Sequence, residues 1–123
     1  MRRDNTARKQ VATRLRATAG GKAAMADDTF DNLIHERTRL AIVSTLAVNN
    51  SVSFSDLKAQ LGLTDGNLSI HAQKLENAGY IDCHKRFARR VPRTEYRLSR
   101  KGRRALDRYL SHMERLIQSV RDP

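Results

Sequence analysis

The stretch that decides the fold is GLTDGNLSIHAQKLENAGYI, residues 62–81. Apolar residues recur in it at steps of four and three, which places them on one face of an α-helix: they are Leu68, Ala72 and Leu75. Thr64 precedes this helix as an N-cap residue, and Gly79 follows it as a stop signal. The link at 62–63 is too short for anything but a turn to the preceding helix, so we predict a helix-turn-helix.

The segment before this stretch predicts two more helices. Apolar positions three and four residues apart indicate a helix at 37–48 with one buried stripe: they are Leu40, Ile42, Val43, Leu46 and Ala47. A short extended stretch follows at 51–53. Ser53 then stands three residues before Asp56, a spacing similar to a capping box, and predicts a second helix that is closed by Gly62.

After Gly79 the apolar period changes from that of a helix to that of a strand. Residues 81–86 alternate between two sides, and residues 94–98 continue with the pairs of a second strand. We predict a hairpin with a basic loop at 87–93, in which Pro92 stands where no backbone donor is required.

The segment 99–123 is predicted to form a long last helix that is capped by Ser99. Its apolar residues step by four, three, four and three, which is a heptad seam: they are Leu106, Leu110, Met113, Ile117 and Val120. Such a seam predicts a symmetric dimer, and packing onto the first helix of the same chain is the alternative. Both can hold if Leu106 and Tyr109 join the core while the later residues project beyond it.

The length of 123 residues allows one compact domain, and the net charge of +11 favours a polyanionic partner. The charge is segregated, since residues 1–26 carry +6, residues 82–98 carry +4, and residues 99–123 carry +4, whereas residues 27–81 carry −3. We expect a disordered basic arm at 1–26, in which Met25 is an alternative start, a folded domain at 27–98, and the dimerisation helix.

Several classes of protein are excluded on the same grounds. The longest mostly apolar stretch, residues 40–48, is about half the length that a membrane span needs, and no apolar run follows the N-terminal arginines as in a secretory signal. We therefore expect a cytoplasmic, nucleoid-associated protein. Cys83 is the one cysteine and reads as a small core residue, and the histidines lack metal-ligand spacing, so we expect no metal and no cofactor. Without a phosphate-binding glycine loop, a nucleophile elbow or a paired carboxylate site, we expect no enzyme.

The order helix, short strand, helix, helix, basic hairpin is that of a winged helix-turn-helix, a mainly α fold with a small β-hairpin. Residues 62–81 resemble the recognition-helix signature of MarR-type and ArsR-type transcriptional regulators. Residues 33–35, 39–42 and 93–98 are similar to a small single-domain subgroup of these proteins. The resemblance covers roughly 30–110 and implies DNA binding. The metal-sensing ArsR-type branch uses paired cysteines, which this sequence lacks, and this puts a metal response in doubt.

A helix fits the major groove of DNA, and its first turns present side chains to base edges. Asn67 and Gln73 have the paired hydrogen-bonding groups that read adenine, Ile70 can lie against a thymine methyl, and Gly66 removes bulk. The predicted contact residues of this helix are Thr64, Asp65, Gly66, Asn67, Ser69, Ile70, His71, Gln73 and Lys74. For Asp65 we expect capping before base contact, and for His71 packing or a phosphate contact. Phosphate or minor-groove contacts are predicted for Arg86, Arg89, Arg90 and Arg93.

The function that follows is a dimeric regulator that binds specific sequences of double-stranded DNA, and by analogy a repressor by occlusion rather than an activator. A small-molecule effector would bind at the dimer seam or between it and the DNA-reading helices. A winged helix that docks another protein, and a nonspecific architectural DNA-binding protein, are the alternatives. The arginine-rich hairpin and the polar face of the third helix argue against a protein-docking module.

Overall fold

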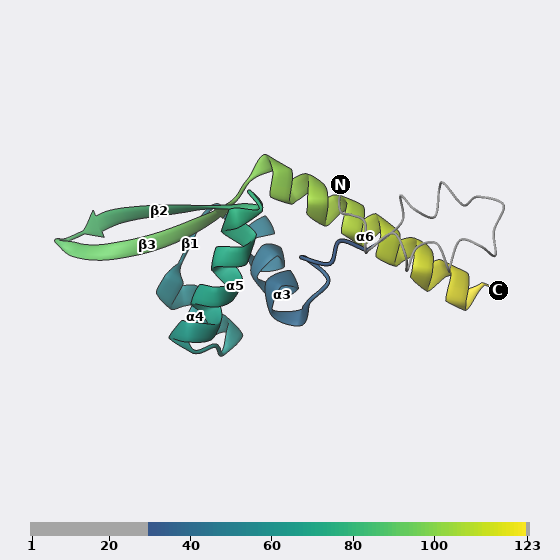
Figure 1. The fold of residues 1–123 in the computed structure, drawn as a ribbon, viewed down its shortest axis with the longest axis horizontal. Coiled ribbons are helices and arrows are strands. Elements are labelled where there is room, and N and C mark those ends of the chain that lie inside the picture. The colour runs from purple at the N-terminus through teal and green to yellow at the C-terminus, as the bar shows by residue number, and fades with distance from the viewer. Residues whose placement is uncertain (1–29, 123) are drawn as a thin grey trace. The chain divides into compact units, whose positions relative to one another are not determined.

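The computed structural model describes residues 30–122 and divides them between two units. Asp31–Ser111 form one unit, and the remaining described residues, 30 and 112–122, belong to the other. Figure 1 shows the elements in chain order: α3 (Arg37–Ala47), β1 (Val52–Ser53), α4 (Phe54–Leu61), α5 (Asp65–Asn77), β2 (Ile81–Ala88), β3 (Val91–Leu98) and α6 (Arg100–Arg121). The predicted fold class, a winged helix-turn-helix, is confirmed. The predicted arm at 1–26 and Met25 lie outside the described residues.

The helix ends are set by the capping residues that the sequence predicted. The Ser53 Oγ accepts a hydrogen bond from the backbone N–H of Asp56 at 3.1 Å, and the Thr64 Oγ1 accepts one from Asn67 at 3.1 Å. Gly62 ends α4 with a φ of 64°, which glycine adopts without steric cost. These local bonds satisfy backbone groups that a helix end would otherwise leave unpaired.

One hydrophobic core lies between α3, α5 and the small sheet. The stripe predicted for α5 is buried. Of the stripe predicted for α3, Ile42, Val43 and Leu46 are buried, and Leu40 and Ala47 pack against the core while partly exposed. The core residues are Ile42, Val43, Leu46, Val52, Leu57, Leu68, Ala72, Leu75, Ile81, Tyr96 and Leu106. Leu106 and Tyr109 of α6 are buried within their own chain, as predicted for the start of that helix.

The hairpin has a shorter loop than the sequence predicted. The strands pair from Ile81 opposite Leu98 to Ala88 opposite Val91, so only Arg89 and Arg90 form the turn, and the prediction of a loop at 87–93 is wrong. The arginines have φ values of 54° and 69°, as a two-residue turn of the mirror-image type requires. Turns of this type normally contain asparagine and glycine. Two arginines are not a recognised signal for such a turn, so the sequence did not predict its position.

Pro92 lies inside β3, opposite Phe87. The pair that flanks a two-residue turn is hydrogen-bonded, and the next pair is not, so the proline nitrogen faces away from β2. Strand β1 covers the other side of β3 only at Glu95 and Tyr96 in the order β1–β3–β2. Pro92 therefore stands where no donor is needed, as predicted.

The start of α6 packs directly on the end of the helix-turn-helix. The Ser99 backbone N–H donates to the Tyr80 carbonyl at 3.0 Å, and the Ser99 Oγ accepts from the Gly102 N–H at 2.9 Å. A Cβ built on Gly102 would lie 2.1 Å from the Tyr80 oxygen and 2.7 Å from the Leu98 side chain. Only glycine fits there, so Gly102 sets how closely α6 approaches the core.

The described part of α6 beyond the core exposes apolar side chains. Leu110 is 46% exposed, Ile117 43% and Val120 72%. In the unit that holds residues 112–122, the ring of Phe30 stacks on His112 with centroids 3.9 Å apart. Among the described residues, no helix has the length and apolar character to cross a membrane.

The close approach at Gly102 predicts a large effect of one methyl group. Gly102→Ala should lower the free energy of unfolding by about 3 kcal/mol, because backbone atoms of Tyr80 have to move. Gly66→Ala is the matched control, since its Cβ would meet nothing within 4 Å, and it should raise stability by roughly 0.5 kcal/mol. Urea unfolding measures both, and a Gly102→Ala protein as stable as the wild type would contradict this packing.

Candidate nucleic-acid interface

Helix α5 is buried along one side only, and the opposite side is the candidate interface, which we call the reading face. Its exposed residues are Asp65, Gly66, Asn67, Ser69, Ile70, Gln73 and Lys74, and Thr64 at the N-cap is exposed as well. Ile70 is the large hydrophobic residue among them and is 57% exposed. The structure thus brings eight of the nine residues predicted on this segment to one accessible surface.

The first turn of α5 combines an open backbone with an ion pair. Nothing within 4 Å would meet a Cβ on Gly66, so the packing of the chain does not explain the glycine there. Asp65 accepts a hydrogen bond from the Lys58 Nζ at 2.8 Å, and a negative charge at this end also suits the helix dipole. The N-cap of α5 is Thr64, so the ion pair, and not the expected capping, is the contact that the structure gives Asp65. Lys58 of α4 is a neighbour that the sequence did not single out.

One side-chain hydrogen bond joins Gln73 of the reading face to the last residue of α5. The Gln73 Nε2 donates to the Asn77 Oδ1 at 2.9 Å, one turn further along the helix. This bond fixes the orientation of the Gln73 amide. A side chain held in this way loses less conformational entropy when it meets a base edge.

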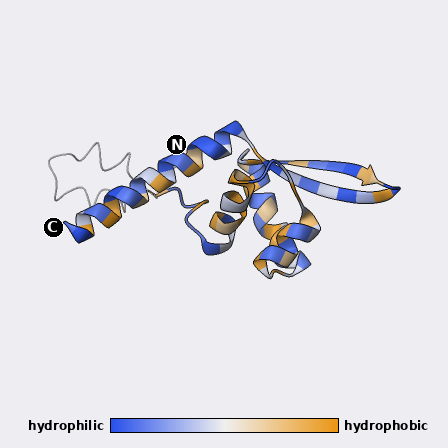
Figure 2. Ribbon diagram, turned by 180° about the vertical axis from the view of Figure 1, so that it is seen from behind, coloured by the Kyte–Doolittle hydropathy of each residue, from blue (hydrophilic) through white to orange (hydrophobic). Residues whose placement is uncertain are grey.

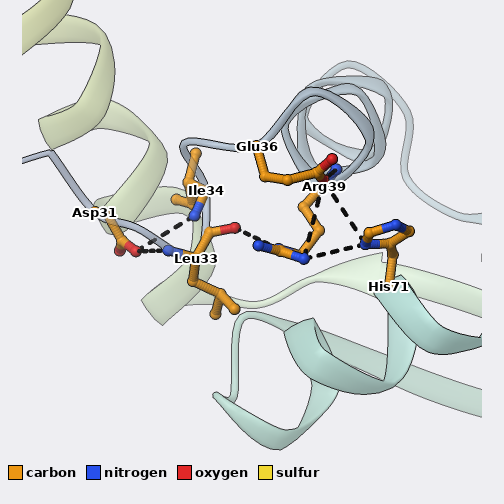
Figure 3. Close-up of polar contacts among 6 residues, drawn as sticks. All are labelled: Asp31, Leu33, Ile34, Glu36, Arg39 and His71. Carbon is orange, nitrogen blue, oxygen red and sulfur yellow. Dashed lines mark hydrogen bonds and ion pairs between the residues drawn. The ribbon is translucent and has the colours of Figure 1, made fainter.

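His71, the ninth residue, is directed toward α3. Figure 3 shows its Nδ1 beside the Arg39 guanidinium, at 3.1 Å from Nη1, and the Glu36 Oε1 lies 3.7 Å away. The structure gives His71 a packing role at the edge of α5, and its phosphate contact stays a prediction.

The partners of His71 hold the start of the domain in place. The Arg39 Nε donates to the Leu33 carbonyl at 2.6 Å, and Glu36 caps α3 by accepting from the Arg39 N–H at 2.7 Å. Burial alone would raise the pKa of Glu36, but the Arg39 and Thr38 N–H groups and the nearby His71 and Arg39 charges lower it overall. The spacing of Glu36 and Arg39 was the available signal for this cluster, and the sequence reasoning gave neither a role.

The segment before α3 is tied down by Asp31. Its Oδ1 accepts from the backbone N–H groups of Leu33 at 2.9 Å and Ile34 at 3.3 Å (Figure 3). Its Oδ2 accepts from the Tyr80 hydroxyl, which follows α5. Asp31 therefore links the segment before α3 to the residues that follow α5.

The hairpin β2–β3, which we call the wing, carries the predicted arginines on its surface. Arg86 bonds to Glu95 across the ladder with 2.9 Å between Nη2 and Oε2, and Glu95 also accepts from the Ser51 Oγ at 3.1 Å. Desolvation opposes it, but these two bonds and the charges of Arg86 and Arg93 lower the pKa of Glu95. Arg86 therefore has a partner within the fold, and Arg93 lies directly opposite it in the ladder.

The outer wing is cationic throughout. Between Lys85 and Thr94 the sequence has five Lys or Arg residues and no acidic residue. Arg89 and Arg90 occupy the turn itself, in a backbone conformation that side chains rarely adopt. Glu95 offsets part of this charge through its bond to Arg86, but the cations nearer the turn still repel one another.

Two proteins from archaea are similar to this chain over most of their length. An uncharacterized protein of Methanocaldococcus jannaschii, MJ0432, is 32% identical over 82 residues, which are 67% of this chain and 89% of that protein. A transcriptional regulator homologue from Pyrococcus horikoshii OT3 superposes with a TM-score of 0.71 at 29% identity, over 76% of this chain and 93% of that one.

A more distant structure has the same fold. The PcaV transcriptional regulator from Streptomyces coelicolor, solved in complex with its natural ligand, gives a TM-score of 0.60 at 18% identity, over 85% of this chain and 79% of that one. The predicted resemblance to winged-helix transcriptional regulators is confirmed. A family model for the winged helix DNA-binding domain matches residues 38–117, and the chain belongs to that family.

Proposed function

We propose that the chain binds specific sequences in double-stranded DNA by placing the reading face of α5 in the major groove. The observation that carries this proposal is the division of α5 into a fully buried stripe and an exposed polar face with an open backbone at Gly66. Asn67 and Gln73 on this face supply paired donors and acceptors for base edges, and Ile70 supplies an apolar contact. Membership of the winged helix DNA-binding family supports DNA binding. The reading face is the surface of the chain whose side chains suit contacts with base edges.

In this proposal the wing contacts the backbone or the minor groove beside the site that α5 reads. Its exposed arginines suit phosphate oxygens, which they reach without reading sequence. Arg89 and Arg90 lie furthest from the core along the ladder and are the main candidates for phosphate contacts. Arg86 is a weaker candidate because its guanidinium forms an ion pair with Glu95.

We also propose that the second half of α6 forms a symmetric dimer. Leu106 belongs to the core of its own chain, so the seam that remains for a partner is Leu110, Met113, Ile117 and Val120. A helix with such a stripe exposed to water gains by pairing with a copy of itself. Two reading faces related by a two-fold axis read a palindromic site. By occupying such a site the dimer would act as a repressor, and its place of action would be the nucleoid.

A small-molecule effector stays a prediction. The Streptomyces neighbour was solved with its natural ligand, which supports the idea for a protein of this fold. Among the described residues, a hollow of about 310 Å³ lies where α3 ends beside α6, and it is lined by residues 46–50, Leu98 and Arg103. Its volume falls within the range of small-ligand sites.

Two substitutions separate sequence reading from phosphate contact. Arg90→Ala should weaken binding to every duplex and reduce the slope of log affinity against log salt by about one, because one phosphate contact is lost. Asn67→Ala should instead weaken a selected site more than random duplex. Fluorescence anisotropy on both duplexes over a range of salt measures this, with Arg104→Ala on α6 as the charge-matched control. Equal losses for Asn67→Ala on both duplexes would reassign Asn67 to the backbone.

Replacing the turn tests whether its arginines serve binding at the expense of stability. Arg89→Asn with Arg90→Gly installs the residues that this turn favours, so the melting temperature should rise. The same change removes two cations, so affinity for duplex should fall and the salt slope should shrink by about two. A variant that is more stable and binds as tightly as the wild type would show that the wing makes no phosphate contact there.

The dimer is tested through its seam. Ile117→Glu places a charge in the proposed interface and should convert a dimer into a monomer in sedimentation at micromolar concentration. Ser119→Glu, on the same exposed helix but outside the seam, is the matched control and should leave the dimer intact. A wild-type chain that sediments as a monomer at every concentration would contradict the seam.

A further inference from the structure

The wing ends in an apolar patch that the core does not use. Phe87 is 73% exposed and lies opposite Pro92, one pair before the turn. Alternation along the strand puts Phe87 on the same face of the sheet as Ile81 and Cys83, which join the core at the base of the wing. Figure 2 shows hydrophobic residues at the far end of the hairpin, beyond a hydrophilic middle. The core-facing side of the wing thus continues past the core as an exposed aromatic and a proline.

The two residues of this patch differ in their surroundings: Pro92 lines an open hollow shared with Ser53 and Phe54 at the start of α4, and Phe87 is not among the residues that line it. Strand β1 pairs with β3 at Tyr96 and Glu95, and Glu95 is separated from Pro92 by two residues of β3. At the usual rise per residue the patch lies roughly 10 Å further out, on a ribbon of two strands. Phe87 is not one of the residues that form or pack against the core, so core packing does not explain an aromatic residue there.

The surroundings of the patch indicate its partner. The outer wing places five cations and no acid around Phe87 and Pro92. A duplex offers the matching chemistry, with two rows of phosphates on either side of stacked apolar base faces. Proteins that bind the minor groove use apolar side chains, phenylalanine and proline among them, as wedges between base pairs, with cations on the flanking phosphates.

We propose that Phe87, supported by Pro92, is a wedge that enters the minor groove, partly unstacks one base step and bends the duplex beside the site read by α5. This inference rests on the proposed function and deepens it. In this proposal Phe87 adds to sequence preference through the bending of DNA. Sites with a flexible pyrimidine–purine step beneath Phe87 should be favoured, although no base edge is read there.

The test uses the full-length chain and a duplex recovered by selection from a random pool with the wild-type protein. Phe87→Ala should weaken binding to this duplex about tenfold, the order expected for one lost contact with a base face. The salt slope should not change, because no charge is removed. Dyes at the two ends of the duplex should report a smaller bend, and 2-aminopurine beside the site should report less unstacking.

Two variants serve as controls. Val91→Ala removes a side chain that is 61% exposed, lies close to Phe87 in the hairpin and belongs to the opposite face, and it should bind and bend as the wild type does. Phe87→Leu keeps an apolar wedge and should restore most of the bend. Melting temperatures equal to that of the wild type would show that all three variants fold.

The possible failures are distinguishable. A wild-type chain that selects no duplex would overturn the proposed function together with the wedge. If the wild type binds while Phe87→Ala binds and bends the duplex equally well, only the wedge is overturned. Loss of binding to phosphatidylserine vesicles on Phe87→Ala, with duplex bending unchanged, would assign the patch to a membrane surface and also overturn it.

Discussion

The burial of one side of α5 is the constraint on which the rest of the structure depends. Leu68, Ala72 and Leu75 reach the core only if α5 lies across α3, with its other side turned outward. Burying each of the two leucine side chains contributes roughly 1.5–3 kcal/mol, far more than a polar surface residue can oppose. The outward residues are therefore free to be chosen for a partner rather than for the fold.

Several polar contacts refine this arrangement at its edges. Arg39 joins the start of α3 to His71 of α5, and Asp31 joins the same region to Tyr80 beyond α5. The wing begins directly after Tyr80, and the Tyr80 carbonyl also receives Ser99 at the start of α6. The end of α5, the start of the wing and the start of α6 therefore meet at Tyr80. The contacts there fix where these three elements begin or end, although the outer wing is exposed.

The sequence predicted what local chemistry decides. The stripes of α3 and α5, the caps at Ser53 and Thr64, and the change of period after Gly79 depend on residues close together in the chain, and the structure confirms them. The two-residue turn was missed because arginine is a poor guide to positive φ.

Other features escaped prediction because they depend on residues far apart in the chain. Gly102 fits only because the Tyr80 carbonyl lies against it, and the contact between Arg39 and His71 spans 32 residues. No local pattern records such an approach. The candidate site divides in the same way, since helical periodicity predicted the exposed residues of α5, whereas the exposure of Phe87 required the register of the hairpin.

Chemical footprinting on a duplex selected from a random pool tests the arrangement of α5 on DNA most directly. If α5 reads the major groove as part of a dimer, guanine N7 atoms should be protected from dimethyl sulfate in two short patches on one side of the duplex, about one helical turn apart. Hydroxyl-radical protection of the backbone should flank those patches where the wings lie. Selection that enriches no sequence, or a bound duplex whose guanine N7 atoms all remain reactive, would contradict the account.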